Sequence, residues 1–153
     1  HCESSAASDV YKRQFRNNEL NTDAIIVVRF QGPKANGMPE LHGLTPILAV
    51  LQDRGLKVAL ITDGRMSGAS GKVPAAIHLS PEAANLGPIS KIKNGDPIRL
   101  DARSGELNIL DENFELRESR KKDLSENERG LGRELFNIFR ENATAAKFGG
   151  GIT

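Results

Sequence analysis

This sequence lacks much of what several common functional classes require. It contains one cysteine, Cys2, which excludes an internal disulfide and a metal site built from several thiolates. It has no tryptophan and one tyrosine, so stacking on nucleic-acid bases is not expected. The 21 lysines and arginines nearly balance the 20 aspartates and glutamates, which argues against a basic surface for nucleic acid or for an anionic membrane.

Long apolar runs are also missing. The longest run, residues 24–30, is interrupted by Arg29, whereas a membrane-spanning helix needs about twenty apolar residues. No charged segment followed by an apolar one marks a signal peptide. We therefore expect a protein with no membrane partner and a cytoplasmic location.

The amino-terminal residues differ in texture from the rest. Residues 1–14, HCESSAASDVYKRQ, are small and polar without periodicity, and the chain begins with His1 instead of methionine. We expect a fragment whose residues 1–14 are spurious or disordered. Residues 15–153 are long enough for one domain with a buried core.

The first half of the remaining sequence predicts an α/β fold. Residues 24–28 and 57–61 are apolar and are interpreted as buried strands. Pro46 suits the first turn of a helix between them, and Gly55 suits its end. Apolar residues fall on one face of that helix at positions Leu44, Ile47, Leu48 and Leu51.

The second half predicts shorter elements. The turn signals are Asn94-Gly95-Asp96 and Ser104-Gly105. Residues 149–151 are three glycines and predict a flexible tail. The expected elements are a strand over 75–79, a helical turn starting at Ser80-Pro81-Glu82, a hairpin of 97–100 with 106–110, a charged helix over 111–123 with contacts from Phe114 and Leu116, a polar linker over 123–130, and an amphipathic helix over 131–142 with Leu135, Ile138 and Phe139 on one side.

Two polar loops that follow the predicted strands are the strongest indication of function. Residues 31–39 contain two prolines and two glycines, which predicts no regular structure. Residues 62–72 hold an acid, two cations and two serines among glycines that let the backbone approach a ligand. Loops on a rigid strand platform often carry chemistry, so we expect the functional site here.

The tripeptide Ser70-Gly71-Lys72 invites comparison with a phosphate-binding P-loop, but the pattern fails. Met66 stands where that motif needs a glycine, and Val73 stands where it needs serine or threonine. Pro74 would also interrupt the helix that should follow. A nucleoside-triphosphate site is therefore not expected.

Ser67 is a candidate base with two interpretations. No histidine–aspartate pair lies near it in the sequence, so a hydrolase triad is poorly supported. A serine acts as a base only if a divalent metal or a cluster of backbone N–H groups stabilises its alkoxide. In most proteins, serines such as Ser67 and Ser70 bond the backbone of their own loop, and the residues alone favour that interpretation.

Two carboxylates also have alternative roles. Glu40 follows Pro39 near the start of the predicted helix, where it is either a dipole-stabilising residue or a ligand for a hard divalent cation. Asp63 is either a similar ligand or an acceptor that caps its loop. His78 is interpreted as a satisfied, half-buried side chain.

Several cations flank the two loops. Together they could clamp an anionic substrate through charge-assisted bonds, although each one alone is more typical of solvated surface. These cations are Arg29, Lys34, Arg65 and Lys72.

Three segments together resemble a known family. They are RFQGPKANGMPELHGLTP, VALITDGRMSGASGKVPAAIHLSPEA and GPISKIKNGDPIRLD, and the similarity runs from about Phe15 to the carboxyl terminus. The sequence is identified as a member of the dihydroxy-acid and sugar-acid dehydratase family. His42, residues 70–74 and the segment GRELF at 132–136 favour its phosphogluconate branch.

The resemblance implies a fold and a reaction. The fold is a swivelling β/β/α domain, a barrel-like mixed sheet with flanking helices. The reaction removes water from a 2,3-dihydroxy acid and leaves a 2-keto-3-deoxy acid. For this branch the substrate is 6-phospho-D-gluconate of the Entner–Doudoroff pathway. Another dihydroxy-acid or sugar-acid dehydratase of the family is the nearest alternative, and a non-catalytic phosphate-binding module is the alternative from another class.

The resemblance also implies roles for residues. Glu40 matches a magnesium ligand and Ser67 matches the proton-abstracting base, while Arg65, Lys72, Lys34 and His42 are candidates for binding the substrate. An iron–sulfur cluster of the 4Fe-4S type is expected as a second cofactor, with its cysteine ligands in an amino-terminal domain that this sequence lacks. We therefore expect a piece that is inactive alone and an intact enzyme that is a homodimer.

Overall fold

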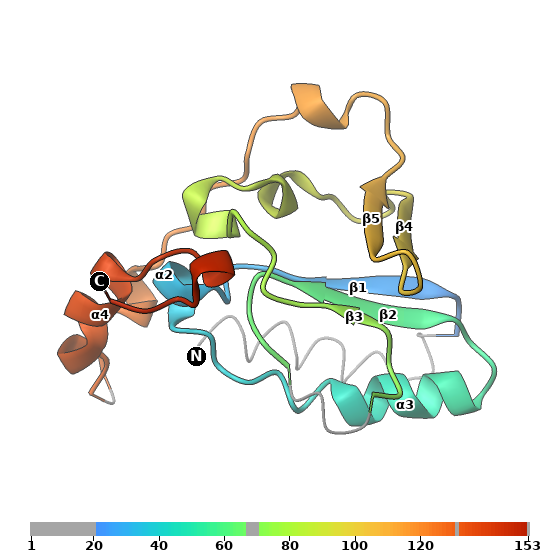
Figure 1. The fold of residues 1–153 in the computed structure, drawn as a ribbon, viewed down its shortest axis with the longest axis horizontal. Helices are drawn as coiled ribbons and strands as arrows, with labels where there is room; N and C mark the ends of the chain where they lie inside the picture. The colour runs from blue at the N-terminus through green and yellow to red at the C-terminus, as the bar shows by residue number, and fades with distance from the viewer. Residues whose placement is uncertain (1–20, 67–70, 131, 153) are drawn as a thin grey trace.

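A computed structural model describes residues 21–66, 71–130 and 132–152 (Figure 1). β1 (Ala24–Val28) and β2 (Val58–Thr62) lie side by side and parallel, with Ala24 opposite Val58 and Val28 opposite Thr62. β3 (Ala75–Ala76) pairs with the other edge of β2, which gives the order β1-β2-β3. Both long strands confirm the sequence prediction within one residue, whereas the third strand is shorter than the predicted 75–79.

The helix α3 (Thr45–Asp53) connects β1 to β2 and covers one face of the sheet (Figure 1). Leu44, Leu48 and Leu51 turn one apolar face inward, as their spacing predicts. Pro46 lies in the first turn, where its missing N–H costs no hydrogen bond. The helix ends before Gly55, whose φ of 89° confirms the predicted stop.

β2 is buried along its whole length because a hydrophobic cluster packs on each face of the sheet. Leu60 faces the cluster formed with α3, and Ile61 faces a second cluster that includes Phe30, Ile89 and Phe114. Both side chains are fully buried, and burial of each contributes about 1.5–3 kcal/mol. This double coverage explains why the strand is an unbroken apolar run and not an alternating one.

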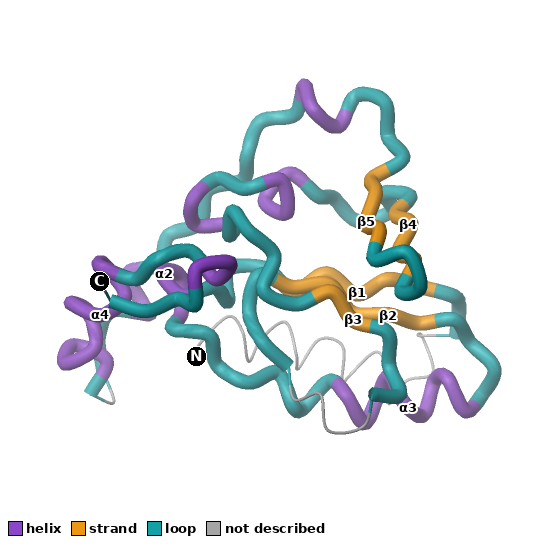
Figure 2. The backbone as a smooth tube through the Cα atoms, viewed as in Figure 1, coloured by secondary structure: helices purple, strands orange, loops and turns teal. Residues whose placement is uncertain are grey.

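β4 (Ile98–Asp101) and β5 (Glu106–Ile109) form the predicted antiparallel hairpin, with Ile98 opposite Ile109. Figure 2 shows its strands as a group separate from the parallel sheet. The α/β class is therefore confirmed. In the part of the chain that the structure describes, the parallel sheet and the antiparallel hairpin share no strand pairing, so they do not close into a barrel.

Two predictions in the middle of the chain are wrong. Residues 31–39 are not wholly irregular, because Pro33 at the first position starts the short helix α2 (Pro33–Asn36) and Gly37 ends it. Residues 111–123 are not a helix, since only Phe114–Leu116 forms a 3-10 turn. Arg117 instead has an extended backbone, with a ψ of 141°, and donates to the carboxylates of Asp96, 21 positions earlier, and of Asp111.

The two residues expected to make contacts within residues 111–123 differ in burial. Phe114 is buried in the second cluster, as predicted, whereas Leu116 is 83% exposed. The linker expected over 123–130 contains a 3-10 turn, Ser125–Asn127. Its Asn127 is buried and donates to the carbonyl of Ala35, so this segment is tied to α2.

The carboxyl-terminal segment also differs from expectation. The predicted helix over 131–142 consists of a 3-10 turn, Arg133–Phe136, followed by α4 (Asn137–Asn142). Its apolar residues Leu135, Ile138 and Phe139 are exposed, so the amphipathic face gains little from burial within this chain. The glycine tail is held instead of free, because the Thr144 N–H donates to the Gly151 carbonyl at 2.9 Å.

One further boundary shifts. The turn predicted to start at Pro81 begins two residues later, as the 3-10 turn Ala83–Asn85, with Glu82 at its N-cap. None of the helices within the described ranges combines the length and apolar character needed to cross a bilayer.

Candidate functional site

Asp63 ties together the loops at the carboxyl ends of β1 and β2. Its carboxylate accepts hydrogen bonds from the backbone N–H groups of Phe30 at 3.1 Å, Gln31 at 2.9 Å and Ala83 at 2.9 Å. The side chain is fully buried. Of the two roles considered for Asp63, the structure supports the loop-capping acceptor, because all three partners are backbone donors.

Burial raises the pKa of the Asp63 carboxyl, and the backbone N–H groups of Gln31, Ala83 and Phe30 oppose that rise without cancelling it. Three N–H groups need an acceptor at this point, and a buried donor without one is costly. Asp63 therefore fixes the shape of the loops from inside and is not available to an incoming substrate.

Glu82 performs a similar task for α2. Its carboxylate accepts from the backbone N–H groups of Lys34 at 3.1 Å and Ala35 at 3.0 Å, in the first turn of the helix. Gly32 at the N-cap has no side chain to do this. Burial is the main cause that raises the pKa of Glu82, and the nearby charge of Asp63 adds to it.

The role of Glu82 is invisible in the sequence because its partners are about fifty positions away along the chain. The one available signal was the absence of a capping side chain before Pro33, which leaves helix N–H groups in need of an acceptor.

Replacing Gly32 with alanine is expected to destabilise the protein by about 1–3 kcal/mol. The new Cβ would lie 2.3 Å from Glu82 Oε2 and 2.8 Å from Glu82 Cβ, so the carboxylate would have to leave the N–H groups of α2. Urea denaturation of the two proteins measures the difference. In the control Gly151→Ala the added Cβ meets no atom within 4 Å, and the free energy of unfolding should change by less than about 0.5 kcal/mol. Equal stability of Gly32→Ala and wild type would contradict this role of Glu82.

Glu40 and Arg65 are brought together by a parallel backbone bridge between the two loops. The Leu41 N–H donates to the Arg65 carbonyl at 3.2 Å, and Arg65 Nε donates to the Met38 carbonyl at 2.7 Å. Both Glu40 and Arg65 are exposed, so their charged groups face solvent at this junction. Ser67 lies outside the described residues, two positions after Arg65 in the sequence.

The junction requires a glycine at position 64. A Cβ there would lie 2.6 Å from Gln31 Cβ and 3.1 Å from the Gln31 carbonyl oxygen. The first loop therefore packs directly on the backbone of the second, which explains one glycine of the second polar loop by close approach.

The remaining candidate residues are spread more widely. Lys34, on α2, and His42, two residues after Glu40, are both exposed. Lys72 Nζ pairs with Asp53 Oδ1 at 2.5 Å, at the carboxyl end of α3, whereas Glu40 precedes the amino end of that helix. The structure thus does not bring Lys72 to Glu40.

Arg29 and His78 make contacts that support the fold. Arg29 Nη1 donates to the carbonyls of Ser90 at 3.2 Å and Ile92 at 2.6 Å, so it joins β1 to the segment before the hairpin. His78 is exposed and has a φ of 58°, so its interpretation as a satisfied, half-buried side chain is wrong. Its backbone N–H donates to the Gly64 carbonyl, so His78 supports the loop through its backbone and not through its side chain.

The donors present fit one of the two expected metal groups. An exposed carboxylate such as Glu40 fits a hard cation such as Mg²⁺. Within residues 21–66, 71–130 and 132–152, no three His, Cys, Asp or Glu side chains are grouped to hold a metal, so Glu40 would be one ligand among others from elsewhere. The described residues contain no cysteine and do not fit an iron–sulfur cluster.

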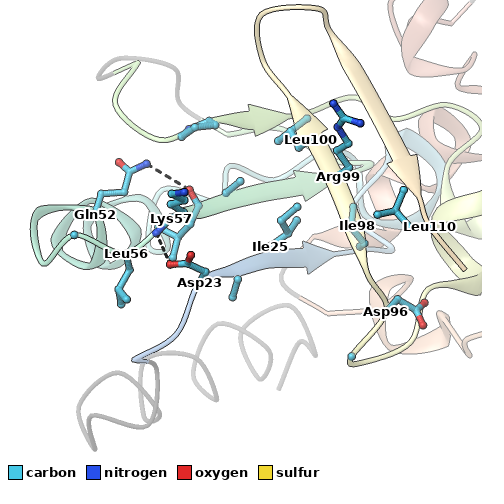
Figure 3. A pocket seen from close by; sticks show the side chains of 16 residues that line it. Asp23, Ile25, Gln52, Leu56, Lys57, Asp96, Ile98, Arg99, Leu100 and Leu110 are labelled. Carbon is cyan, nitrogen blue, oxygen red and sulfur yellow. Dashed lines mark hydrogen bonds between the residues drawn. The ribbon is translucent and has the colours of Figure 1, made fainter.

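Among the described residues, two cavities of similar size lie at opposite ends of the sheet. The larger, of about 980 Å³, lies between the hairpin and the amino ends of β1 and β2, near Asp23, Lys57 and Arg99 (Figure 3). The second, of about 930 Å³, lies beside α2 and α4 and reaches Met38. Ligands of α/β sheets bind at the carboxyl ends of the strands, so the second cavity is the better candidate although it is slightly smaller.

The family described as "Dihydroxy-acid/6-phosphogluconate dehydratase C-terminal" matches residues 4–150, which is nearly the whole chain. The chain belongs to the dihydroxy-acid/6-phosphogluconate dehydratase family. The match starts inside residues 1–14, and the boundary at residue 15 stays a prediction.

Named members of this dehydratase family differ in how similar they are to the chain. "Phosphogluconate dehydratase" of Rhizobium meliloti is 59% identical over 140 residues, which are 90% of this chain and 23% of that protein. The protein of the same name from Zymomonas mobilis is 54% identical over 92% of this chain and 23% of that protein. "Dihydroxy-acid dehydratase" of Ignicoccus hospitalis is 41% identical over 71% of this chain and 19% of that protein.

The chain spans about a fifth to a quarter of the length of these dehydratases. The family membership therefore describes a carboxyl-terminal part, and the matching region includes both loops that meet at Glu40 and Arg65.

Proposed function

We propose that this chain is the carboxyl-terminal part of an enzyme that removes water from 6-phospho-D-gluconate and yields 2-dehydro-3-deoxy-6-phosphogluconate. The observation that carries the proposal is the difference in identity, 59% to a phosphogluconate dehydratase against 41% to a dihydroxy-acid dehydratase. This substrate would assign the enzyme to the Entner–Doudoroff pathway, in the cytoplasm.

In this reaction a proton leaves carbon 2 and hydroxide leaves carbon 3, and the resulting enol becomes the 2-keto acid. Mg²⁺, when bound, would stabilise negative charge that develops on the substrate carboxylate. Glu40 would hold that cation at the loop junction. Arg65, anchored through Nε to Met38, would place its positive charge beside the same carboxylate.

Ser67 would take the proton from carbon 2. It follows Arg65 by two positions, and the bridge of Arg65 with Glu40 supports a serine near the metal ligand. A hydroxyl close to a divalent cation loses its proton more readily, which is what a serine base requires.

The other properties expected from the resemblance remain part of this proposal. The rest of the enzyme would supply the further magnesium ligands and the cysteines of the iron–sulfur cluster. The sheet with α3 would belong to a swivelling β/β/α domain whose barrel needs further strands. The intact enzyme would be a homodimer that binds neither nucleic acid nor membranes.

A chimera tests the proposal. Residues 15–153 replace the matching carboxyl-terminal quarter of the Rhizobium meliloti protein, and dehydration is followed as formation of 2-keto acid. We expect turnover of 6-phosphogluconate at a higher kcat/KM than that of unphosphorylated dihydroxy acids. Turnover of only unphosphorylated acids would instead favour the dihydroxy-acid alternative, and phosphate binding without any turnover would favour a non-catalytic module.

The same chimera separates the two interpretations of Ser67. Ser67→Ala should lower kcat by at least about a hundredfold if Ser67 is the base. The control Ser104→Ala changes an exposed serine of the hairpin turn and should leave kcat unchanged. Equal kcat values for both variants would assign Ser67 to its own loop.

A further inference from the structure

We propose that the cavity beside α2 and α4 binds the phosphoryl group of the substrate through Arg133 and Arg140. The inference rests on the proposed function, since it assigns the part of the site that recognises the end of the substrate remote from the reaction. Both arginines line this cavity of about 930 Å³, and no Asp or Glu is among its lining residues in the described part of the chain. An anion is therefore the ligand that its charge favours.

The cavity lies at the carboxyl ends of the strands, the same end of the sheet as the junction of Glu40 and Arg65. α2 and α4 lie together in Figure 1, at the end of the sheet to which β1 leads. Met38 lines the cavity, and its carbonyl accepts the Arg65 Nε bond at 2.7 Å. Glu40 is two residues further on, so the Cα atoms of Met38 and Glu40 lie within about 8 Å. A six-carbon acid whose carboxylate is held at Glu40 can extend its phosphoryl end toward this cavity.

Arg133 is fixed in place by a series of side-chain hydrogen bonds. Its Nη1 donates to Asn36 Oδ1 at 2.8 Å, and Asn36 Nδ2 donates to Gln31 Oε1 at 2.9 Å. Gln31 is in turn anchored to Asp63 through its backbone N–H. The series runs from the buried centre of the loops to the cavity wall, so the guanidinium is oriented before a ligand arrives.

Arg140 lies on the same wall. Its Nη2 donates to Asn137 Oδ1 and to the carbonyl of Arg133 at 3.4 Å. Both arginines are half-buried, which limits the screening of their charges by water. A guanidinium can also offer two parallel N–H groups to one phosphoryl group, which a lysine cannot.

A glycine tract leaves room for the ligand. Gly149, Gly150 and Gly151 line the cavity, and a Cβ built on Gly151 would meet no atom within 4 Å. Unlike Gly149 and Gly150, Gly151 does not have a positive φ that would exclude a side chain. A larger residue at 151 should therefore fit the backbone and add atoms to the lining of this cavity.

Steady-state kinetics of the chimera provide the test. Arg140→Gln and Gly151→Leu should each raise the KM for 6-phosphogluconate by roughly ten- to a hundredfold, the effect of losing a charge-assisted hydrogen bond or the space for it. The kcat should change by less than about threefold, because binding remote from the reacting carbons is lost equally from ground and transition states. Arg103→Gln, in the exposed hairpin turn, removes the same charge and should leave both constants unchanged.

Arg133→Gln is the less specific variant because the bond to Asn36 that it removes belongs to the series that reaches the buried loops, whereas the bonds of Arg140 to Asn137 and Arg133 stay within the carboxyl-terminal segment. Thermal unfolding of both variants is therefore measured alongside. An unchanged KM in both Arg140→Gln and Gly151→Leu would overturn the proposal. If the parent chimera is inactive, the proposed function fails, and calorimetric titration with inorganic phosphate decides the site separately. Binding that Arg140→Gln weakens at least tenfold supports the site, and binding that it leaves unchanged overturns it.

Discussion

Replacement of Asp63 with alanine is expected to lower the free energy of unfolding by at least about 3 kcal/mol. Its carboxylate satisfies the buried N–H groups of Phe30, Gln31 and Ala83, and each donor left without an acceptor costs about 1–3 kcal/mol. Chemical denaturation of wild type and variant measures the loss, and amide hydrogen exchange should quicken at these three positions. The matched control is Asp53→Ala, which removes an exposed carboxylate with one surface ion pair and should cost less than about 1 kcal/mol.

The pH dependence of this difference has a definite sign. The pKa of Asp63 is raised in the folded protein above its ordinary value of 3.8, so folding favours the protonated form. The stabilisation from protonated Asp63 is fully present at pH values below the ordinary pKa and is lost as the pH rises through the raised pKa of the folded protein. The stability difference between wild type and Asp63→Ala should therefore shrink over this interval. If this difference in the free energy of unfolding instead grows with pH over the same interval, hydrogen bonds from the backbone N–H groups stabilise the Asp63 carboxylate more than burial destabilises it.

Replacement of Glu40 with glutamine should lower kcat/KM of the chimera by more than about a hundredfold. Loss of a residue that merely orients a metal ligand costs about 10- to 100-fold, and loss of a ligand itself should cost more. Glutamine keeps the size of the side chain and removes the charge that attracts Mg²⁺. Initial rates measured over a series of Mg²⁺ concentrations check the prediction.

The concentration series distinguishes metal binding from a structural effect. Excess Mg²⁺ should restore part of the Glu40→Gln activity, because weaker binding is offset by mass action. Glu106→Gln, on the exposed side of the hairpin, carries the same change and should behave as wild type at every concentration. A Glu40→Gln variant with normal activity, or one with reduced activity that Mg²⁺ never alters, would rule out the ligand role.

The parts of the fold that could be predicted are those determined by nearby residues. β1, β2 and α3 follow from apolar runs and helical spacing, and the hairpin follows from its turn residues. The sequence also located the loops that meet at Glu40 and Arg65, because polar residues and glycines directly follow buried strands.

The parts that could not be predicted depend on contacts between distant residues. Glu82 caps a helix on another segment, and Arg117 pairs with Asp96, 21 positions earlier, in a segment where charge and composition suggested a helix. Arg133 reaches Asn36 across 97 positions, so no local pattern could place it beside the loops. These side chains act through tertiary geometry, on which a single sequence carries no direct information.

Anomalous diffraction from crystals of the chimera grown with Mn²⁺ in place of Mg²⁺ tests the central claim most directly. The account predicts a peak about 2.0–2.6 Å from a carboxylate oxygen of Glu40, with the guanidinium of Arg65 and the hydroxyl of Ser67 on the same side of the loop junction. A metal peak remote from Glu40, or a Ser67 hydroxyl on the opposite face of the sheet, would contradict it.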